Sequence, residues 1–196
     1  MRPGDSLRKL IATSLLRTSL CTKLQLPNNS LIIQIGEYGK PFIAANYNLH
    51  FNLSHSGDYI VCAFNNSEIG IDIEEITERD AEAISAFFSL QEKCAYNNKS
   101  PIEKEGFFFD LWTAKESFIK AIGNGFAIDI TKFTIHFDTI ITAETTIESR
   151  HWHFKQYEID PKYKMTVCSL TSDFPQDIRF IKFNDVVSCA DKLIYE

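Results

Sequence analysis

Two acidic residues stand two apart in the segment IGIDIE, residues 69–74. Alternate residues of a β-strand share a face, so Asp72 and Glu74 face one way together with Gly70, and three isoleucines face the other way. Residues two apart on a strand are about 7 Å apart, and their carboxylates can converge on one cation. Gly70 leaves room on that face for a ligand to approach the backbone. A solvated strand face is the alternative on this pattern alone.

A third acidic residue lies in FFFDLWTAKESFIKAIGNG, residues 107–125, whose apolar spacing predicts a helix. Glu116 and Lys120 are four apart and share a helix face, with Lys115 as their neighbour. An exposed ion pair is the plain interpretation. Trp112 lies one turn before Glu116 on the same face, however, and so large an aromatic indicates partial burial. A partly buried glutamate flanked by two lysines suits a site for a cation and phosphates.

Two shorter segments carry further polar groups. In FNLSHSGDY, residues 51–59, His55 stands between two serines just before Gly57. A serine–histidine nucleophile pair is disfavoured, because adjacent side chains rarely face each other and no G-x-S-x-G motif is present. A histidine in a turn would rather donate a hydrogen bond to a phosphate. The tight loop EYGKP, residues 37–41, presents Tyr38 and Lys40, which could stack on a base and hold a phosphate, or form a plain turn.

The donor types indicate which metal such a site would take. Three carboxylates with nearby basic side chains and no Cys/His cluster favour a hard cation bound through oxygen. Mg²⁺ fits best, because it takes few protein carboxylates and completes its shell with water and phosphate; Mn²⁺ is a second candidate. His151 and His153 would share a strand face, but a zinc site needs further ligands that the sequence does not offer.

The elements that must position these residues follow from periodicity and breakers. A helix is expected from Ser6 to Leu24, capped by Asp5. Further helices are expected over about 80–88, 91–96 and 103–122, the last ended by the glycines after Ile122. Strands are expected over 31–35, 58–64 and 69–74. Residues 132–137, 145–150, 151–159 and 164–170 read as an antiparallel meander.

Composition limits the class of protein. The chain has 196 residues, 44% hydrophobic and 23% charged, with sixteen phenylalanines, which is typical of a folded globular protein. A net charge of −6 provides no general attraction for nucleic acid. No apolar run approaches the roughly 20 residues of a membrane span. Five scattered cysteines without a C-x-x-C pair favour reduced thiols and a cytoplasmic location.

The chain resembles the 4′-phosphopantetheinyl transferases of the Sfp type. FNLSHSG, IGIDIE and FFFDLWTAKESFIKAIGNG occur there in this order and at this spacing. The EYGKP loop, the segment YEIDPKYKMTVC at 157–168, and the pair Asp5 and Arg8 also match. The resemblance implies an α+β fold of two similar halves, residues 1–68 and 69–196. Each half would be an antiparallel sheet with a helix against it, related by a pseudo-two-fold axis with the site between them.

The resemblance also implies an activity: Mg²⁺-dependent transfer of 4′-phosphopantetheine from coenzyme A to a serine of an acyl or peptidyl carrier protein, releasing 3′,5′-ADP. Asp72, Glu74 and Glu116 would bind the metal. The coenzyme A contacts would be Arg8, Tyr38, Gly39, Lys40, Pro41, Ser54, His55, Lys115, Glu116 and Lys120. Glu116 would be the base, His55 or Lys120 would stabilise the leaving group, and Glu92 would support the site. A monomer is expected. Fatty-acid, polyketide and nonribosomal-peptide carrier proteins all remain open as acceptors, although the Sfp-like pattern favours nonribosomal peptide or polyketide synthesis.

One departure leaves alternatives open. Members of the Sfp type usually carry an extra strand and helix before the segment where this chain begins. Either the start is truncated or misassigned, or the protein does without that portion, and only in the last case would coenzyme A affinity be lower. A non-catalytic module that binds coenzyme A or a carrier protein is the first alternative. A Mg²⁺ phosphodiesterase is the second. The retained acidic set favours the transferase, since a mere binder has little need for three metal ligands.

Overall fold

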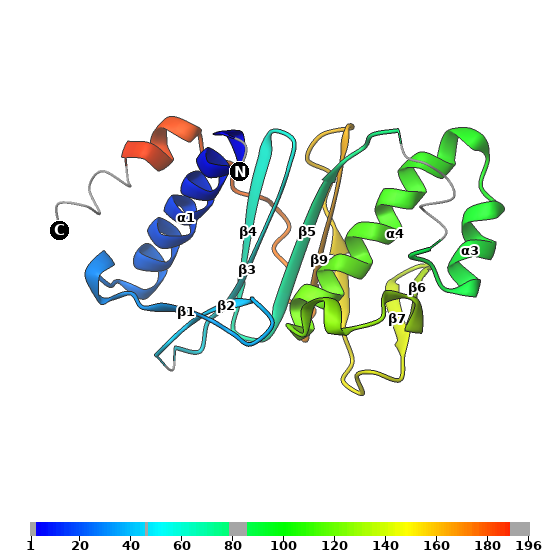
Figure 1. The fold of residues 1–196 in the computed structure, drawn as a ribbon, viewed down its shortest axis with the longest axis horizontal. Helices are drawn as coiled ribbons and strands as arrows, with labels where there is room; N and C mark the ends of the chain where they lie inside the picture. Colours follow the sequence, from blue (N-terminus) through cyan, green and yellow to red (C-terminus); the bar gives the residue numbers. More distant parts are fainter. Residues whose placement is uncertain (1–2, 46, 79–85, 189–196) are drawn as a thin grey trace. The chain divides into compact units, whose positions relative to one another are not determined.

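The computed structural model describes residues 3–45, 47–78 and 86–188 (Figure 1). Helices are mixed with strands, and the strand pairings among residues 50–169 are all antiparallel. The expected α+β class is therefore confirmed. The helix expected over 80–88 falls mainly outside the described residues. Within the described ranges, no helix combines the length and apolar character needed to cross a membrane.

The chain forms two compact units. Among the described residues, the first comprises 3–34, 41–45, 47 and 175–188, and the second comprises 35–40, 48–78 and 86–174. The predicted halves, 1–68 and 69–196, divide the sequence differently; they and their two-fold relation stay predictions.

The first unit contains a long helix and most of a small sheet. Helix α1 (Pro3–Leu24) is followed by a 3₁₀ turn η1 (Asn28–Ser30) and by the paired strands β1 (Ile33–Ile35) and β2 (Pro41–Ile43). Arg17 ties the helix to the next segment, donating to the Asn28 side chain at 2.5 Å and to the Leu31 carbonyl at 3.1 Å. The helix was expected, but it begins at Pro3, so Asp5 lies within it and the predicted cap at Asp5 is wrong. Strand β1 is shorter than the expected 31–35, and β2 was not foreseen.

The second unit begins with a hairpin and a three-stranded sheet. Strands β3 (His50–Ser56) and β4 (Tyr59–Asn65) form the hairpin, and Gly57 turns it with φ +51°. The sheet has the order β5 (Ile69–Glu75), β9 (Tyr163–Ser169), β8 (His153–Gln156). The turn expected around His55 is therefore wrong, because that residue lies in a paired strand.

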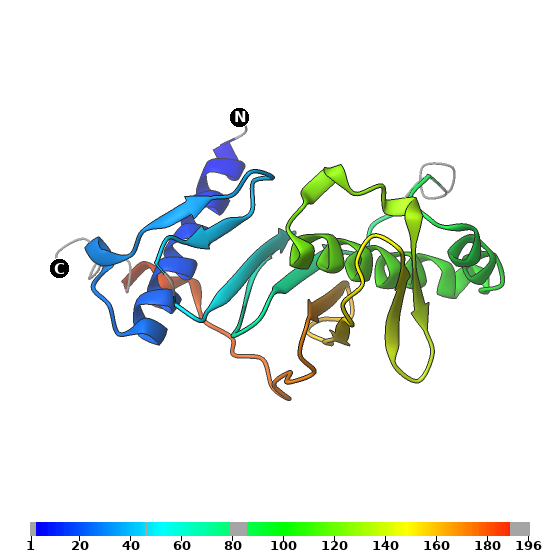
Figure 2. The same cartoon turned by 90° about the horizontal axis from the view of Figure 1, so that it is seen from below.

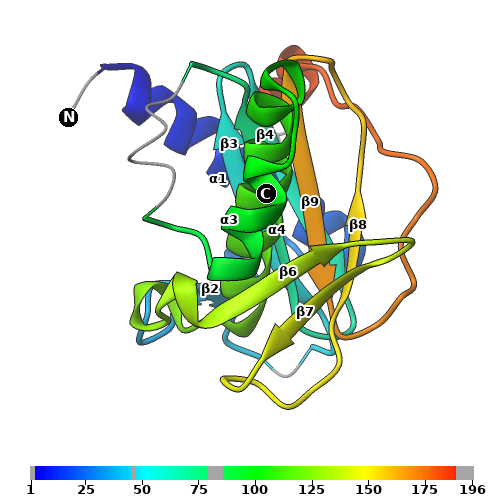
Figure 3. The ribbon, with the colours of Figure 1, turned by 90° about the vertical axis from the view of Figure 1, so that its right-hand side faces the viewer.

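A second hairpin consists of β6 (Phe133–Phe137) and β7 (Ile141–Thr145). Strand β6 contacts helices α3 (Leu90–Asn97) and α4 (Pro101–Ile122), and strand β7 contacts β8 (Figures 2 and 3). The strand expected over 145–150 is wrong, since β7 ends at Thr145. The strand expected over 151–159 is limited to His153–Gln156.

Helix α4 positions the chemistry of the second unit. The short helix α3 (Leu90–Asn97) and α4 (Pro101–Ile122) each begin with a capping box, in which a serine and a glutamate satisfy each other's backbone amides. Gly123, at φ +86°, ends α4 in the left-handed conformation. Figures 1 and 3 place α4 along β5 and β9, the strands it contacts most.

Gly70 allows this close packing. A Cβ at Gly70 would lie 2.0 Å from the Ser117 carbonyl oxygen and 2.4 Å from the Ala121 nitrogen, both on α4. The space expected there for a ligand is therefore filled by the helix, and that expectation is corrected. The close approach brings the polar faces of β5 and α4 together.

The other side of α4 faces the core. The core is mainly aromatic and draws on α4, β6 and the segment before β8: Phe108, Phe109, Phe118, Phe133 and Trp152. Burial of these rings supplies the main stabilising free energy of the second unit.

Candidate active site

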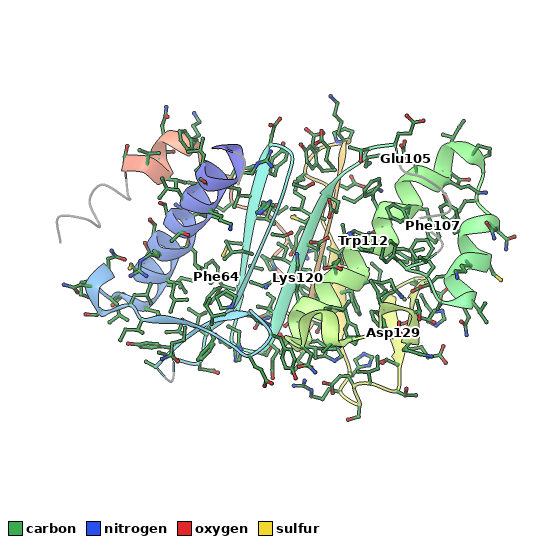
Figure 4. The ribbon with its side chains drawn as sticks, in the orientation of Figure 1. Phe64, Glu105, Phe107, Trp112, Lys120 and Asp129 are labelled. Atoms are coloured by element: carbon green, nitrogen blue, oxygen red, sulfur yellow. The ribbon has the colours of Figure 1, made fainter. Side chains whose placement is uncertain are left out.

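A cavity of about 310 Å³ opens in the second unit, against β3, β5 and α4. Its lining consists of Leu53, Ser54, His55, Asp72, Glu74, Trp112, Glu116 and Lys120. The three carboxylates expected to share a metal thus line one cavity, from β5 and α4. Trp112 and Lys120, labelled in Figure 4, come from the same helix as Glu116.

Asp72 is almost fully buried, with 3% of its surface exposed. Its Oδ1 accepts hydrogen bonds from Lys120 Nζ at 2.5 Å and from Ser54 Oγ at 2.8 Å. Its Oδ2 is buried and has no hydrogen-bond partner among the described residues. Burial raises the pKa of Asp72, and the Lys120 ammonium opposes that shift. A buried carboxylate oxygen without a partner is costly, so this atom suits a cation.

Glu74 is held by donors on both of its oxygens. Trp112 Nε1 donates to Oε1 at 3.3 Å, and Ser56 Oγ donates to Oε2 at 3.0 Å. Trp112 is half-buried, as its place on the helix face predicted. The two donors come from different elements, so the Glu74 carboxylate is oriented from α4 and from β3 at once.

Glu116 completes the acidic set on the α4 side. Burial raises its pKa, the Asp72 carboxylate adds to that effect, Lys120 opposes it, and Glu74 adds a smaller rise. Three acids around one cavity repel one another when all are ionised. A bound divalent cation would relieve that repulsion.

The residues present fit a magnesium ion. They offer carboxylate oxygens, which hard cations prefer, and one of these oxygens is buried without a partner. Within the part of the chain that the structure describes, no group of three or more Asp, Glu, His or Cys side chains is arranged so that it could hold a metal ion. The metal-ligand roles of Asp72, Glu74 and Glu116 therefore stay a prediction.

Sequence comparison assigns the chain that forms this cavity to a protein family. The family model described as 4′-phosphopantetheinyl transferase superfamily matches residues 68–168, and the model described as 4′-phosphopantetheinyl transferase, N-terminal, matches residues 1–67. The chain belongs to the 4′-phosphopantetheinyl transferase superfamily. The resemblance seen in the sequence motifs is thereby confirmed.

Two relatives of this transferase extend the match over most of the chain. The 4′-phosphopantetheinyl transferase Sfp of Bacillus subtilis is 36% identical over 185 residues, covering 93% of this chain and 83% of that protein. The transferase gsp of Aneurinibacillus migulanus is 38% identical over 171 residues, covering 86% and 70%. A solved holo-(acyl-carrier-protein) synthase from Bacillus anthracis is 18% identical, with a TM-score of 0.46, over 52% of this chain and 93% of that one.

Lys115 of the transferase does not lie at the cavity. Its side chain is fully buried and pairs with Glu92, with Nζ 2.7 Å from both carboxylate oxygens and 2.8 Å from the Phe133 carbonyl. The expected contact between Lys115 and a phosphate is contradicted by this burial. Successive helix residues point about 100° apart, so Lys115 turns into the core while Glu116 faces the cavity. Glu92 pairs with that buried lysine and binds no cavity residue among those described.

The EYGKP loop is anchored by its lysine. Lys40 Nζ donates to the Ile69 carbonyl at 3.1 Å and the Ala121 carbonyl at 2.9 Å, and burial lowers its pKa to about 8. Gly39 adopts φ +86° in the turn, and Tyr38 is half exposed. None of these three lines the cavity described above. Their coenzyme A contacts stay predictions.

The remaining residues expected to contact coenzyme A lie in two different units of the chain. Ser54 and His55 line the cavity, with His55 exposed. Arg8 is exposed on α1 and Pro41 begins β2, and both belong to the first unit. The roles of Arg8 and Pro41 toward coenzyme A stay predictions.

The sequence reading missed the part played by Ser56. A signal was available: Asn52, Ser54 and Ser56 are each two residues apart, which is the period of one face of a strand. That period would have placed Ser54 and Ser56 on the same side, facing a common partner.

Proposed function

We propose that this transferase moves the 4′-phosphopantetheine arm of coenzyme A to a serine of an acyl or peptidyl carrier protein, with Mg²⁺ as its metal. The observation that carries the proposal is the cavity where Asp72, Glu74 and Glu116 meet Lys120. The buried, unpartnered Oδ2 of Asp72 is a position where positive charge is needed. We further propose that the protein is a cytoplasmic monomer that acts in nonribosomal peptide or polyketide synthesis.

Asp72, Glu74 and Glu116 would hold the magnesium ion. When bound, the ion would neutralise charge on the diphosphate of coenzyme A and on the departing group. Lys120 Nζ lies 2.5 Å from Asp72 and is partly exposed, so it adds a fixed positive charge beside the same carboxylate. His55, exposed at the cavity, can donate a ring N–H to a phosphate oxygen.

The transfer itself exchanges one phosphorus–oxygen bond for another. The serine hydroxyl of the carrier protein attacks the β-phosphorus, which bears the pantetheine. The bond from that phosphorus to the bridging oxygen breaks, and 3′,5′-ADP leaves with the electron pair. The serine proton passes to the Glu116 carboxylate and from there to solvent. Glu116 is assigned this step because its carboxylate lines the same cavity as Asp72, Glu74 and Lys120.

Mass spectrometry of a carrier protein tests the proposal. The transferase is incubated with coenzyme A, Mg²⁺ and a panel of fatty-acid, polyketide and peptidyl carrier proteins, each with a serine-to-alanine control. A gain of one phosphopantetheine arm on the intact serine, lost when the metal is chelated, is expected. Coenzyme A binding without any gain would identify a non-catalytic module instead. Release of 3′,5′-ADP without a carrier protein would identify a hydrolase.

A further inference from the structure

Strands β3 and β5 contact each other but belong to different sheets. Three backbone amides of β5 donate hydrogen bonds to side chains of β3. The Ile71 amide donates to Asn52 Oδ1 at 2.9 Å. The Ile73 amide donates to Ser54 Oγ at 3.4 Å, and the Glu75 amide donates to Ser56 Oγ at 3.0 Å. Side-chain oxygens of β3 thus accept the hydrogen bonds that the backbone carbonyls of a neighbouring strand would accept in a continuous sheet.

The two serines make a second bond that Asn52 does not. Ser54 Oγ donates to Asp72 Oδ1 at 2.8 Å, and Ser56 Oγ donates to Glu74 Oε2 at 3.0 Å. A hydroxyl has one proton to donate and lone pairs to accept with. Because the β5 amide occupies a lone pair, the hydroxyl is held with its proton toward the carboxylate. Each serine therefore accepts a hydrogen bond from one amide of β5 and orients the acidic side chain of the residue that precedes that amide.

We propose that Ser56 is a positioning residue that aims the Glu74 carboxylate at the metal, in the same manner as Ser54 acts on Asp72. The inference rests on the proposed function, since it assigns Glu74 to magnesium. Groups that hydrogen-bond a metal-binding carboxylate fix its direction, and their loss typically weakens metal binding about 10- to 100-fold. Ser56 is the sharper test of the pair, because Ser54 also accepts a bond from Lys120 at 3.0 Å.

Asn52 provides a matched control. It accepts from a β5 amide as the serines do, is buried, and bonds no carboxylate among the described residues. Asn52→Ala therefore damages the junction of β3 with β5 without disturbing an acidic side chain directly. Ser56→Thr keeps the hydroxyl and should restore what Ser56→Ala loses. Trp112→Phe removes the donor on the other oxygen of Glu74 and provides a second, independent variant.

The experiment measures metal binding directly. Mn²⁺ binding to each variant is followed by electron paramagnetic resonance, with and without coenzyme A, beside the Mg²⁺ dependence of transfer and thermal unfolding. Ser56→Ala is expected to bind Mn²⁺ about 10-fold more weakly and to need correspondingly more Mg²⁺ at saturating coenzyme A. Ser56→Thr is expected to match the wild type, and Trp112→Phe to weaken Mn²⁺ binding as Ser56→Ala does. Asn52→Ala is expected to lose stability while keeping its Mn²⁺ affinity.

Two results would overturn the inference: unchanged Mn²⁺ affinity in Ser56→Ala, or an equal loss of affinity in Asn52→Ala, which would make the serine merely structural. If Ser56→Ala does not fold, Trp112→Phe provides the test instead. An unchanged Mn²⁺ affinity in Trp112→Phe would show that the hydrogen-bond donors of Glu74 do not position its carboxylate for the metal. A wild-type protein that transfers phosphopantetheine while Ser56→Ala keeps normal metal affinity refutes only this inference. A wild-type protein that neither binds Mn²⁺ nor transfers the arm refutes the proposed function itself.

Discussion

Helix α4 carries two lysine–carboxylate pairs that differ in how completely they are satisfied. Lys115 pairs with Glu92 in the core, and Lys120 pairs with Asp72 at the cavity. The core pair has no exposed side-chain surface. Lys115 Nζ bonds both oxygens of Glu92 and the Phe133 carbonyl, and Glu92 also accepts from the amides of Ser89 and Ile135.

The cavity pair is incomplete. Lys120 is 27% exposed, and one oxygen of Asp72 is buried without a partner among the described residues. A fully hydrogen-bonded buried pair has no capacity left for a ligand, whereas an incomplete one does. The same chemical pair is therefore structural on one face of the helix and available for function on the other.

Breaking the core pair should have the largest effect on stability. Lys115→Met leaves the Glu92 charge buried without its cation, which typically costs about 3–5 kcal/mol of unfolding free energy. Urea unfolding measures the loss, and transfer activity per folded molecule should stay near the wild-type value. A stable Lys115→Met protein with weakened coenzyme A binding would contradict the structural assignment and restore the phosphate contact expected from the sequence motif.

Breaking the cavity pair from the acidic side should chiefly affect turnover. Asp72→Asn removes a proposed metal ligand and is expected to lower transfer about 100- to 1,000-fold, which corresponds to about 3–4 kcal/mol of barrier. Stability should not fall, because the substitution removes a buried charge whose Oδ2 has no hydrogen-bond partner among the described residues. Turnover by carrier-protein mass and unfolding in urea separate the two effects. Near-normal turnover would remove Asp72 from the metal site.

These two lysines also mark where sequence reasoning succeeded and where it stopped. Periodicity predicted a helix ending before Gly123 and placed Trp112, Glu116 and Lys120 on one face, and the structure confirms both. Alternation likewise placed Asp72 and Glu74 together on β5. Such local geometry follows from the fixed repeat of helix and strand.

The errors concern partners distant in sequence. Lys115 was grouped with Glu116 because they are adjacent, although its partner Glu92 lies on another helix and only the fold brings them together. The space beside Gly70 was assigned to a ligand, because nothing in the segment reveals that α4 fills it. The asparagine and serines of β3 resemble turn residues by composition, and their strand role depends on β4 and β5.

The repulsion among the three acidic residues of the cavity can be tested by measuring thermal stability at different pH values. The pKa of Glu116 is raised, so the folded, metal-free protein is stabilised by protonation of this group and loses that stability as pH rises through the raised value. Glu116→Gln should therefore melt a few degrees higher than the wild type at pH 8, with the difference shrinking toward pH 4. Added Mg²⁺ should narrow the difference at pH 8, because only the wild type keeps all three acids. Equal melting temperatures at pH 8 without metal would show that Glu116 carries no such repulsion.

A second pH effect comes from a third lysine at the same helix, which bonds carbonyls in place of a carboxylate. Lys40 meets the Ala121 carbonyl near the C-terminal end of α4, where the helix dipole favours a cation, yet burial lowers its pKa from 10.5 to about 8. Between those two values the unfolded chain holds a proton that the folded protein has released, so this group makes stability rise with pH. The wild type should therefore gain unfolding free energy relative to Lys40→Met as pH increases from 8 to 10, and show a constant difference below pH 8. Urea unfolding of both proteins across this range measures the gain. A difference that stays constant up to pH 10 would show that Lys40 keeps its proton and is better solvated than its two carbonyl partners imply.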